Sequence, residues 1–297
     1  MRFKVVFGID METDIGSWTP EYRGVREGTP LLLELFEKYD IKGTFFWVGV
    51  TARDNPEMAK SVAQAGHETG FHSLYHETVG EALFPIPGVY PLLPEELENR
   101  LVIAKKMVWD ATGIEPTSFR SPRLFGSTHV VNVLERLNIR VDSSYPMYYF
   151  RKQLEPYHPA ALDWTEKGEM KILEIPNFAD LSMESHDQYG RDRDQWPLFR
   201  TEGAESLLEH IRNFLEYAKG KLDNAPVLCF YFHPWEFAEM PQGEIYSGEG
   251  YVKPDPFIVR NCGDYALRQL DILISALKNM RAEFTTCRDL AQVFDRM

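Results

Sequence analysis

The chain has 297 residues, of which 32 are Lys or Arg and 45 are Asp or Glu, so its formal net charge is −13 at pH 7. A hydrophobic content of 44% and a charged content of 26% are typical of globular proteins and exclude extensive disorder. The negative charge disfavours nucleic acids and anionic membranes as partners, and it disfavours acidic polymers as substrates unless a local basic patch compensates.

Short apolar runs alternate with amphipathic segments along the whole chain. Strands are expected where β-branched and aromatic residues dominate, at 3–10, 43–49, 67–72, 117–120, 139–143, 171–176, 226–233 and 283–286. Helices are expected between them, at 28–39, 55–65, 94–112, 127–137, 203–219, 263–280 and 288–295. This alternation predicts an α/β fold whose parallel sheet forms a closed or nearly closed barrel. No linker or low-complexity tract divides the chain, so we expect one domain over 1–297.

Long irregular segments interrupt the alternation at 13–27, 77–93, 144–170, 177–202 and 234–262. Most of them follow strands, which is where barrel enzymes build their active sites, and their aromatic content argues for ordered rim loops. The N-terminal residues show no signal-peptide pattern, and no apolar stretch is long enough to span a membrane. We therefore expect a cytoplasmic protein with reduced cysteines (Cys229, Cys262 and Cys287). Its oligomeric state is not predicted.

Two histidines, His72 and His76, follow the third predicted strand. If the chain turns helical after His72, the i, i+4 spacing places both imidazoles on one face, where they can reach one divalent ion. Taken alone, this spacing is more often found in histidines with ordinary hydrogen bonds. A second signal is needed.

That signal lies at the end of the first predicted strand, in Asp10 and Glu12. Residues i and i+2 of a strand share a face, so both carboxylates point the same way. Carboxylates are rarely buried without a partner, and a metal ion would compensate them. One carboxylate of the pair could bind the metal while the other acts as a general base.

Further polar residues end other predicted strands. Arg120 and the rigid Pro122 suit a fixed clamp on a carboxylate, Asp142 follows the fifth strand, and His233 ends an otherwise apolar strand. Each signal is weak alone. Because parallel strands of a barrel end on the same rim, their combination predicts one catalytic site.

These residues resemble the motifs of the polysaccharide deacetylase family (carbohydrate esterase family 4, with NodB homology), and the resemblance spans nearly the whole chain. The resemblance rests on the segments His72-Ser73-Leu74-Tyr75-His76 and Arg120-Ser121-Pro122 and on Asp142 and His233. The resemblance implies a distorted (β/α)7 barrel with one divalent ion, zinc in the first place, with cobalt, iron and nickel also compatible. The commoner first motif has two adjacent aspartates, whereas this chain has Asp10-x-Glu12. Either of these two could be the ligand, and Asp14 is an outside candidate.

The resemblance also implies the chemistry, which is hydrolysis of an N-acyl (acetyl) group on a sugar or a related carbon–nitrogen amide. Glu12, His72 and His76 would hold the metal that activates water. Asp10 would act as the base, oriented by Arg120.

Other residues are expected to serve the leaving group and the substrate. His233, positioned by Asp142 or a nearby carboxylate, would protonate the departing amine. Pro122, Tyr145 and Trp235 are the expected substrate-binding residues, with a backbone N–H near Tyr145 helping to stabilise the oxyanion. Aromatic loop residues could stack on sugar rings or simply pack the loops (Trp18, Phe84, Tyr90, Tyr148, Tyr149 and Trp235).

Three alternatives remain open at this point. The segment 23–34 resembles the deformylase of lipid-linked formamido-arabinose, and allantoinase-like or cyclic-imide hydrolases share the same fold. A catalytically inactive, sugar-binding relative is the non-enzymatic alternative. The expected ligand in every case is a small molecule or a saccharide.

Overall fold

The computed structural model describes residues 2–294, and its centre is a parallel sheet built around β1 (Lys4–Met11). The first half of β1 pairs with β12 (Glu283–Thr285) and the second half with β2 (Thr44–Trp47), while β9 (Val227–Phe232) pairs with β1 from Lys4 to Ile9. From β2 the sheet continues in the order β3 (Glu68–Phe71), β4 (Ser118–Phe119), β5 (Val141–Asp142) and β8 (Leu173–Glu174). All eight predicted strands are therefore present, and every pairing in this sheet is parallel.

The sheet curls until the chain after β8 reaches β9. Asn177 forms parallel bridges with both Pro146 and Cys229, and the N–H of Phe178 donates to the carbonyl of Cys229 at 2.7 Å. These few contacts span the gap between the two outer strands. The result is the distorted barrel that the alternation of elements predicted.

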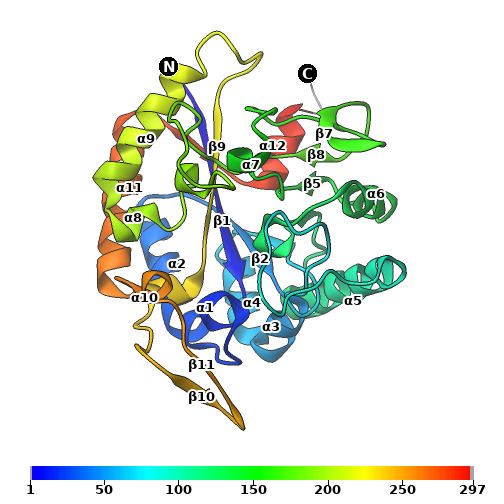
Figure 1. Ribbon diagram of the computed structural model, residues 1–297, viewed down its shortest axis with the longest axis vertical. Coiled ribbons are helices and arrows are strands. Elements are labelled where there is room, and N and C mark those ends of the chain that lie inside the picture. Colours follow the sequence, from blue (N-terminus) through cyan, green and yellow to red (C-terminus); the bar gives the residue numbers. More distant parts are fainter. Residues whose placement is uncertain (1, 295–297) are drawn as a thin grey trace.

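Helices surround the barrel at each of the seven predicted positions. They are α2 (Thr29–Lys38), α4 (Pro56–Gln64), α5 (Pro94–Thr112), α6 (Thr128–Arg136), α9 (Ala204–Tyr217), α11 (Asp264–Asn279) and α12 (Cys287–Phe294). Figure 1 shows α2, α9 and α11 on one side of β1 and α5 and α6 on the other. Short helical elements absent from the prediction lie at α1 (Asp14–Ser17), α3 (Gly49–Asp54), α7 (Met147–Phe150), α8 (Leu198–Thr201) and α10 (Pro256–Val259), with single turns at Gly24–Gly28, Pro122–Leu124, Arg191–Arg193 and Pro234–Phe237.

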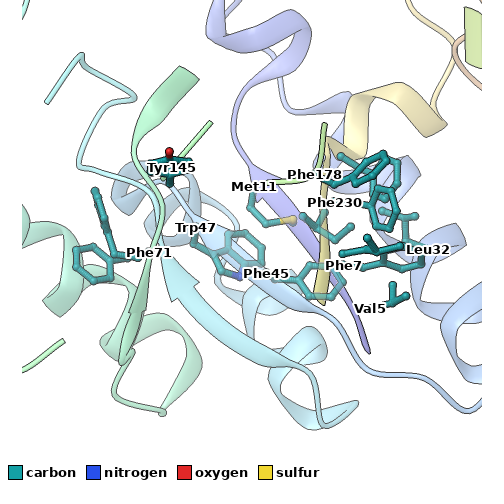
Figure 2. Packing of buried hydrophobic residues seen from close by; sticks show 14 of the residues in the cluster. Val5, Phe7, Met11, Leu32, Phe45, Trp47, Phe71, Tyr145, Phe178 and Phe230 are labelled. Carbon is teal, nitrogen blue, oxygen red and sulfur yellow. The ribbon is translucent and has the colours of Figure 1, made fainter. Parts of the chain in front are cut away.

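Alternation along β1 separates the helix-facing core from the barrel interior. Phe7 points outward and packs against Phe36 of α2 and Phe230 of β9, with ring centroids 5.9 and 5.7 Å apart (Figure 2). Val6 and Gly8 point inward, where the guanidinium of Arg120 crosses above Gly8. Because side chains alternate along a strand, the next inward residue is Asp10, at the rim.

The rim loops contain two antiparallel hairpins, β6 (Pro159–Ala160) with β7 (Asp163–Lys167), and β10 (Ile245–Ser247) with β11 (Gly250–Val252). The second hairpin projects as an arm below α1 and α10 in Figure 1. Within residues 2–294, no helix combines the length and apolar character needed to cross a bilayer.

Candidate active site

A cavity of about 500 Å³ opens at the carboxyl ends of the strands. Six of the predicted catalytic, metal-binding and substrate-binding residues line it, namely Asp10, Glu12, His72, His76, His233 and Trp235. They come from β1, β3 and β9 or from the residues directly after these strands. Parallel strands thus deliver distant parts of the sequence to one rim.

Glu12, His72 and His76 form a compact group of possible metal ligands. Their ligand atoms all lie within 4.8 Å of one another, and the three side chains are buried. The Nε2 atom of His76 lies 2.6 Å from a carboxylate oxygen of Glu12. Two imidazoles and one carboxylate are a donor set that suits zinc and several other divalent ions.

The segment after His72 is a bend, not the helix that the spacing suggested. The carboxylate of Glu77 accepts hydrogen bonds from the hydroxyl of Ser73 (3.0 Å) and the N–H of Tyr75 (2.6 Å), which closes the chain on itself. Ser73 and His76 adopt left-handed backbone angles, with φ of 63° and 62°. The bend still brings the rings of His72 and His76 to 5.1 Å between centroids.

Hydrogen bonding and burial prepare His72 for metal binding. Its Nδ1 lies 2.7 Å from the backbone carbonyl of Arg120, which can only accept a hydrogen bond. Nδ1 therefore carries the proton, and Nε2 keeps a free lone pair. Burial lowers the pKa of His72 to about 4, so the ring stays neutral at physiological pH. Neutral imidazole is the form that coordinates metals.

Glu12 is held as a carboxylate. Burial alone would raise its pKa, but His76, His233 and His72 reverse the effect and keep it well below its usual range. The indole N–H of Trp235 donates to Glu12 Oε1 at 3.1 Å. Trp235, expected as a substrate-binding residue, thus orients the carboxylate of Glu12 beside the cavity.

Asp10 is paired with Arg120 inside the barrel. Arg120 Nη1 donates to Asp10 Oδ1 at 2.9 Å, while its other donors reach the carbonyl and hydroxyl of Ser143, each at 3.0 Å. The guanidinium also lies over the ring of Phe46, 4.4 Å from the centroid. Arg120 is fully buried, and these contacts hold it and Asp10 in one geometry.

His233 faces the metal-ligand group from the opposite side. Its Nε2 lies 3.8 Å from Glu12 Oε1, and its Nδ1 lies 3.0 Å from Glu236 Oε1. Glu236 is held in turn by the buried Arg200, whose Nε donates to it at 2.7 Å. Burial would lower the pKa of His233, but Glu12 and Glu236 outweigh it and raise the pKa to about 9. A cation bound to Glu12 would offset part of that carboxylate's effect.

The structure corrects the expected role of Asp142. Parallel pairing of β5 with β8 places Asp142 opposite Glu174, and its carboxylate accepts from the hydroxyl of Ser144 inside the barrel. Burial raises the pKa of Asp142 to about 6 and that of Glu174 well above its usual value. Asp142 does not line the cavity or reach His233. The nearby carboxylate that orients His233 is Glu236.

Two expected substrate-binding residues also lie elsewhere. The N–H of Tyr145 donates to Glu174 Oε1 at 2.8 Å, so it is not free for an oxyanion. Pro122 is buried in a turn whose next two residues, Arg123 and Leu124, line the cavity in its place. Asp14, the outside candidate, accepts from two backbone N–H groups and does not line the cavity.

Several lining residues carried no clear signal in the sequence. They are the cations Arg123, Arg191 and Lys253 and the aromatic residue Trp196, all from rim loops. Glu236 stands three residues after His233, and this spacing was the one available clue to its role. Of the aromatic residues expected at the site, Trp18, Phe84 and Trp235 line the cavity, whereas Tyr90, Tyr148 and Tyr149 do not.

The fold and the site define a class of protein, a parallel α/β barrel with a candidate metal centre on its rim. The family model described as polysaccharide deacetylase matches residues 14–141, which is less than half of the chain. This part of the chain, which includes both histidines of the metal-ligand group, is similar to the polysaccharide deacetylase family.

Curated proteins with the same activity in their names are also similar to this chain. The chain is 27% identical to the peptidoglycan deacetylase of Helicobacter pylori over 199 residues, covering 58% of this chain and 64% of that protein. It is 32% identical to the peptidoglycan-N-acetylglucosamine deacetylase of Bacillus cereus over 145 residues, covering 49% and 58%. The chain thus spans less than two thirds of the length of these curated relatives.

Solved structures show the same fold at low sequence identity. A protein from Mycobacterium smegmatis assigned to the polysaccharide deacetylases has a TM-score of 0.65 at 17% identity, covering 97% of this chain and 88% of the other. The Puue allantoinase has a TM-score of 0.62 at 16% identity, covering 97% and 89%. The fold is therefore shared with an allantoinase, so the fold alone does not identify the substrate.

Proposed function

We propose that the protein is a metal-dependent hydrolase that removes the acetyl group from an N-acetylated sugar. The observation that carries the proposal is the convergence of three groups on one cavity. These are the metal-ligand group of Glu12, His72 and His76, the Asp10–Arg120 pair, and His233. Together they supply the ligands, the base and the acid that amide hydrolysis requires.

The ligand group fits a divalent ion for reasons internal to this chain. His72 is neutral and has its Nε2 lone pair free, and Glu12 is ionised. When bound, the ion supplies Lewis acidity to the acyl carbonyl and to the attacking water. We propose zinc as the resident ion, because it accepts two imidazole nitrogens and one carboxylate while leaving a position open.

The base in this scheme is Asp10. Its carboxylate lines the cavity and is fixed by Arg120, so it can accept the proton of a water that attacks the carbonyl carbon. Arg120 stays charged in the fully buried position, because Asp10 compensates the cost of burial. The pair therefore holds the base in place throughout the reaction.

The acid is His233. Nδ1–H of His233 donates a hydrogen bond to Glu236, which leaves Nε2–H pointing toward Glu12 and the cavity. When the carbon–nitrogen bond breaks, His233 donates this proton to the departing nitrogen, so that a neutral amine leaves together with acetate. Without this proton the amine is a poor leaving group.

The test measures acetate release from N-acetylglucosamine oligomers by the purified full chain, before and after metal removal and with zinc restored. His72→Ala removes one ligand and should lower both the bound metal and the rate, the latter by at least about 100-fold. His129→Ala, an exposed histidine of α6, is the matched control and should leave both unchanged.

Retained metal and full activity in His72→Ala would contradict the scheme. Parallel assays with formamido sugars and with ureido or cyclic-imide substrates separate deacetylation from the alternative hydrolases. A metal-loaded protein that turns over none of them would be an inactive, sugar-binding relative.

A further inference from the structure

The cavity is lined by three cations although the chain as a whole is acidic. Arg123, Arg191 and Lys253 line it, and apart from Asp10 and Glu12 the lining contains a single carboxylate, Asp255. That carboxylate is engaged locally, because it accepts from the N–H of Phe257 at 2.9 Å and caps α10. Apart from Asp10 and Glu12, the cavity lining is therefore net positive.

Arg123 is the most informative of these cations. Its side chain makes a hydrogen bond to the carbonyl of His76 (3.3 Å) and lies 5.9 Å from the ring centroid of Trp18. Among the described residues, no carboxylate lies within ion-pair distance of it. The side chain is half-buried, so water reaches only part of the guanidinium. A guanidinium has five donors, and a bound anion would supply the missing partner.

The backbone is strained at the same position. Arg123 and Leu124 have φ values of 60° and 59°, in the left-handed region that residues with side chains rarely adopt. Such a conformation is unfavourable for residues with side chains and persists where the surroundings enforce it, commonly at ligand-binding sites. Both residues line the cavity. The strain therefore accompanies the placement of a cation at the site.

The other two cations differ in how far their charge is already neutralised. Arg191 is held between the rings of Phe84 (5.2 Å) and Tyr148 (5.4 Å), and its Nη2 lies 3.7 Å from Asp194. Lys253 is exposed on the strand-to-helix segment after the β10–β11 arm (Figure 1), and it has no ion-pair partner among residues 2–294. Arg123 and Lys253 thus contribute the unneutralised charge.

We propose that the substrate carries an anionic group, a carboxylate or a phosphate, which Arg123 binds inside the cavity and Lys253 attracts at its mouth. This inference rests on the proposed deacetylase function and narrows its substrate to an anionic N-acetylated sugar. The net charge of −13 still repels long polyanions. One anionic group close to the acetamido group satisfies both observations, because salt screens the remaining surface charge beyond about 8 Å.

The experiment compares N-acetylglucosamine with N-acetylglucosamine 1-phosphate and with N-acetylmuramic acid, which separates phosphate from carboxylate. With the wild-type protein, we expect KM for at least one charged sugar to be about 10-fold or more below that of the neutral sugar. Arg123→Gln should remove this preference, Arg123→Lys should restore part of it, and Arg136→Gln on α6 should have no effect. Raising the salt concentration should weaken binding of the charged sugar alone.

A second variant guards against an indirect effect, because Arg123 touches the carbonyl of the metal-ligand candidate His76. Lys253→Gln lies at the mouth and should raise KM for the charged sugar by about 3-fold while bound metal stays unchanged. Equal KM values for neutral and charged sugars, or equal losses for both in Arg123→Gln, would overturn the proposal. Calorimetric binding of the same three sugars distinguishes a failure of the anion-binding proposal from a failure of the proposed deacetylase function. A binding preference for the anion without hydrolysis would refute the deacetylase activity and support the cationic subsite.

Discussion

Gly8 is the position at which a single methyl group should disable the site from inside the barrel. A Cβ atom built on Gly8 would lie 2.7 Å from Cζ of Arg120 and 2.5 Å from its Nη2, with Nη1 closer still. The guanidinium cannot simply swing aside, because it is fully buried and bonded to Asp10, Ser143 and Cys229. In Gly8→Ala the methyl group therefore competes with this hydrogen-bond set.

The loss of stability in Gly8→Ala can be estimated from the ion pair that Arg120 would lose. Separating a buried charge from its partner destabilises a protein by about 3–5 kcal/mol. For a domain of this size, each kcal/mol lowers Tm by about 2–4 °C, so Tm should fall by roughly 6–20 °C. Asp10 would also lose its orienting partner, and kcat should fall by at least about 10-fold. Bound metal should change little, because His72 bonds to the backbone carbonyl of Arg120 and not to its side chain.

The assay combines thermal unfolding, metal analysis and acetate release. Gly250→Ala in the exposed β10–β11 arm is the matched control, since the nearest atom to its Cβ is the carbonyl oxygen of Ser247 at 4.0 Å. Wild-type Tm and rate in Gly8→Ala would show that the barrel interior accommodates the methyl group. In that case the close approach of Arg120 to Gly8 would not constrain the Asp10–Arg120 pair, which would refute the prediction.

Three further predictions follow from other contacts. Glu236→Gln should lower the pKa of His233, because a carboxylate that raises this pKa is removed. The limb of the pH profile of kcat that reports the acid should therefore move to lower pH. A limb that does not move would assign the acid to another group. Ser127→Ala should lower the free energy of unfolding, measured by chemical denaturation, by about 1 kcal/mol, because the Ser127 hydroxyl caps α6. An unchanged denaturation midpoint would mean that water replaces the cap. Glu174→Gln should raise Tm at pH 8–9 relative to the wild type. The folded protein holds the shared proton of Glu174 and Asp142 at raised pKa values, so stability is lost as pH rises above the unfolded value near 4.5. A Tm difference that does not grow between pH 5 and pH 9 would contradict the shared proton.

The strands and the main helices follow from local sequence patterns. Eight apolar runs became the eight strands of the parallel sheet, and seven amphipathic segments became helices within one or two residues of their expected bounds. The short elements were missed, for example α3 and the β10–β11 arm. They lie within or beside rim loops, where packing against neighbouring segments outweighs local propensity.

Much of the candidate site also follows from the order of the elements. Parallel strands end on one rim, so residues at strand ends, such as Asp10, His72, Arg120 and His233, meet there whatever the loops between them do. The i, i+2 spacing of Asp10 and Glu12 likewise brings both carboxylates to the same cavity. Local periodicity and strand direction are enough for these placements.

The partners of these residues were decided only by the tertiary structure. Pairing of β5 with β8 sets Asp142 against Glu174, and Glu236 takes the place beside His233. The cationic residues reach the cavity through loops, Arg123 by way of a strained turn. The contact between Asp142 and Glu174 joins segments far apart in the chain and depends on strand register, while the places of Glu236 and Arg123 depend on the path of the loop, and a local sequence pattern predicts neither. The sequence by itself thus determined the barrel and the chemistry at its rim, and the tertiary structure decided the proton partners and the charge that a substrate would meet.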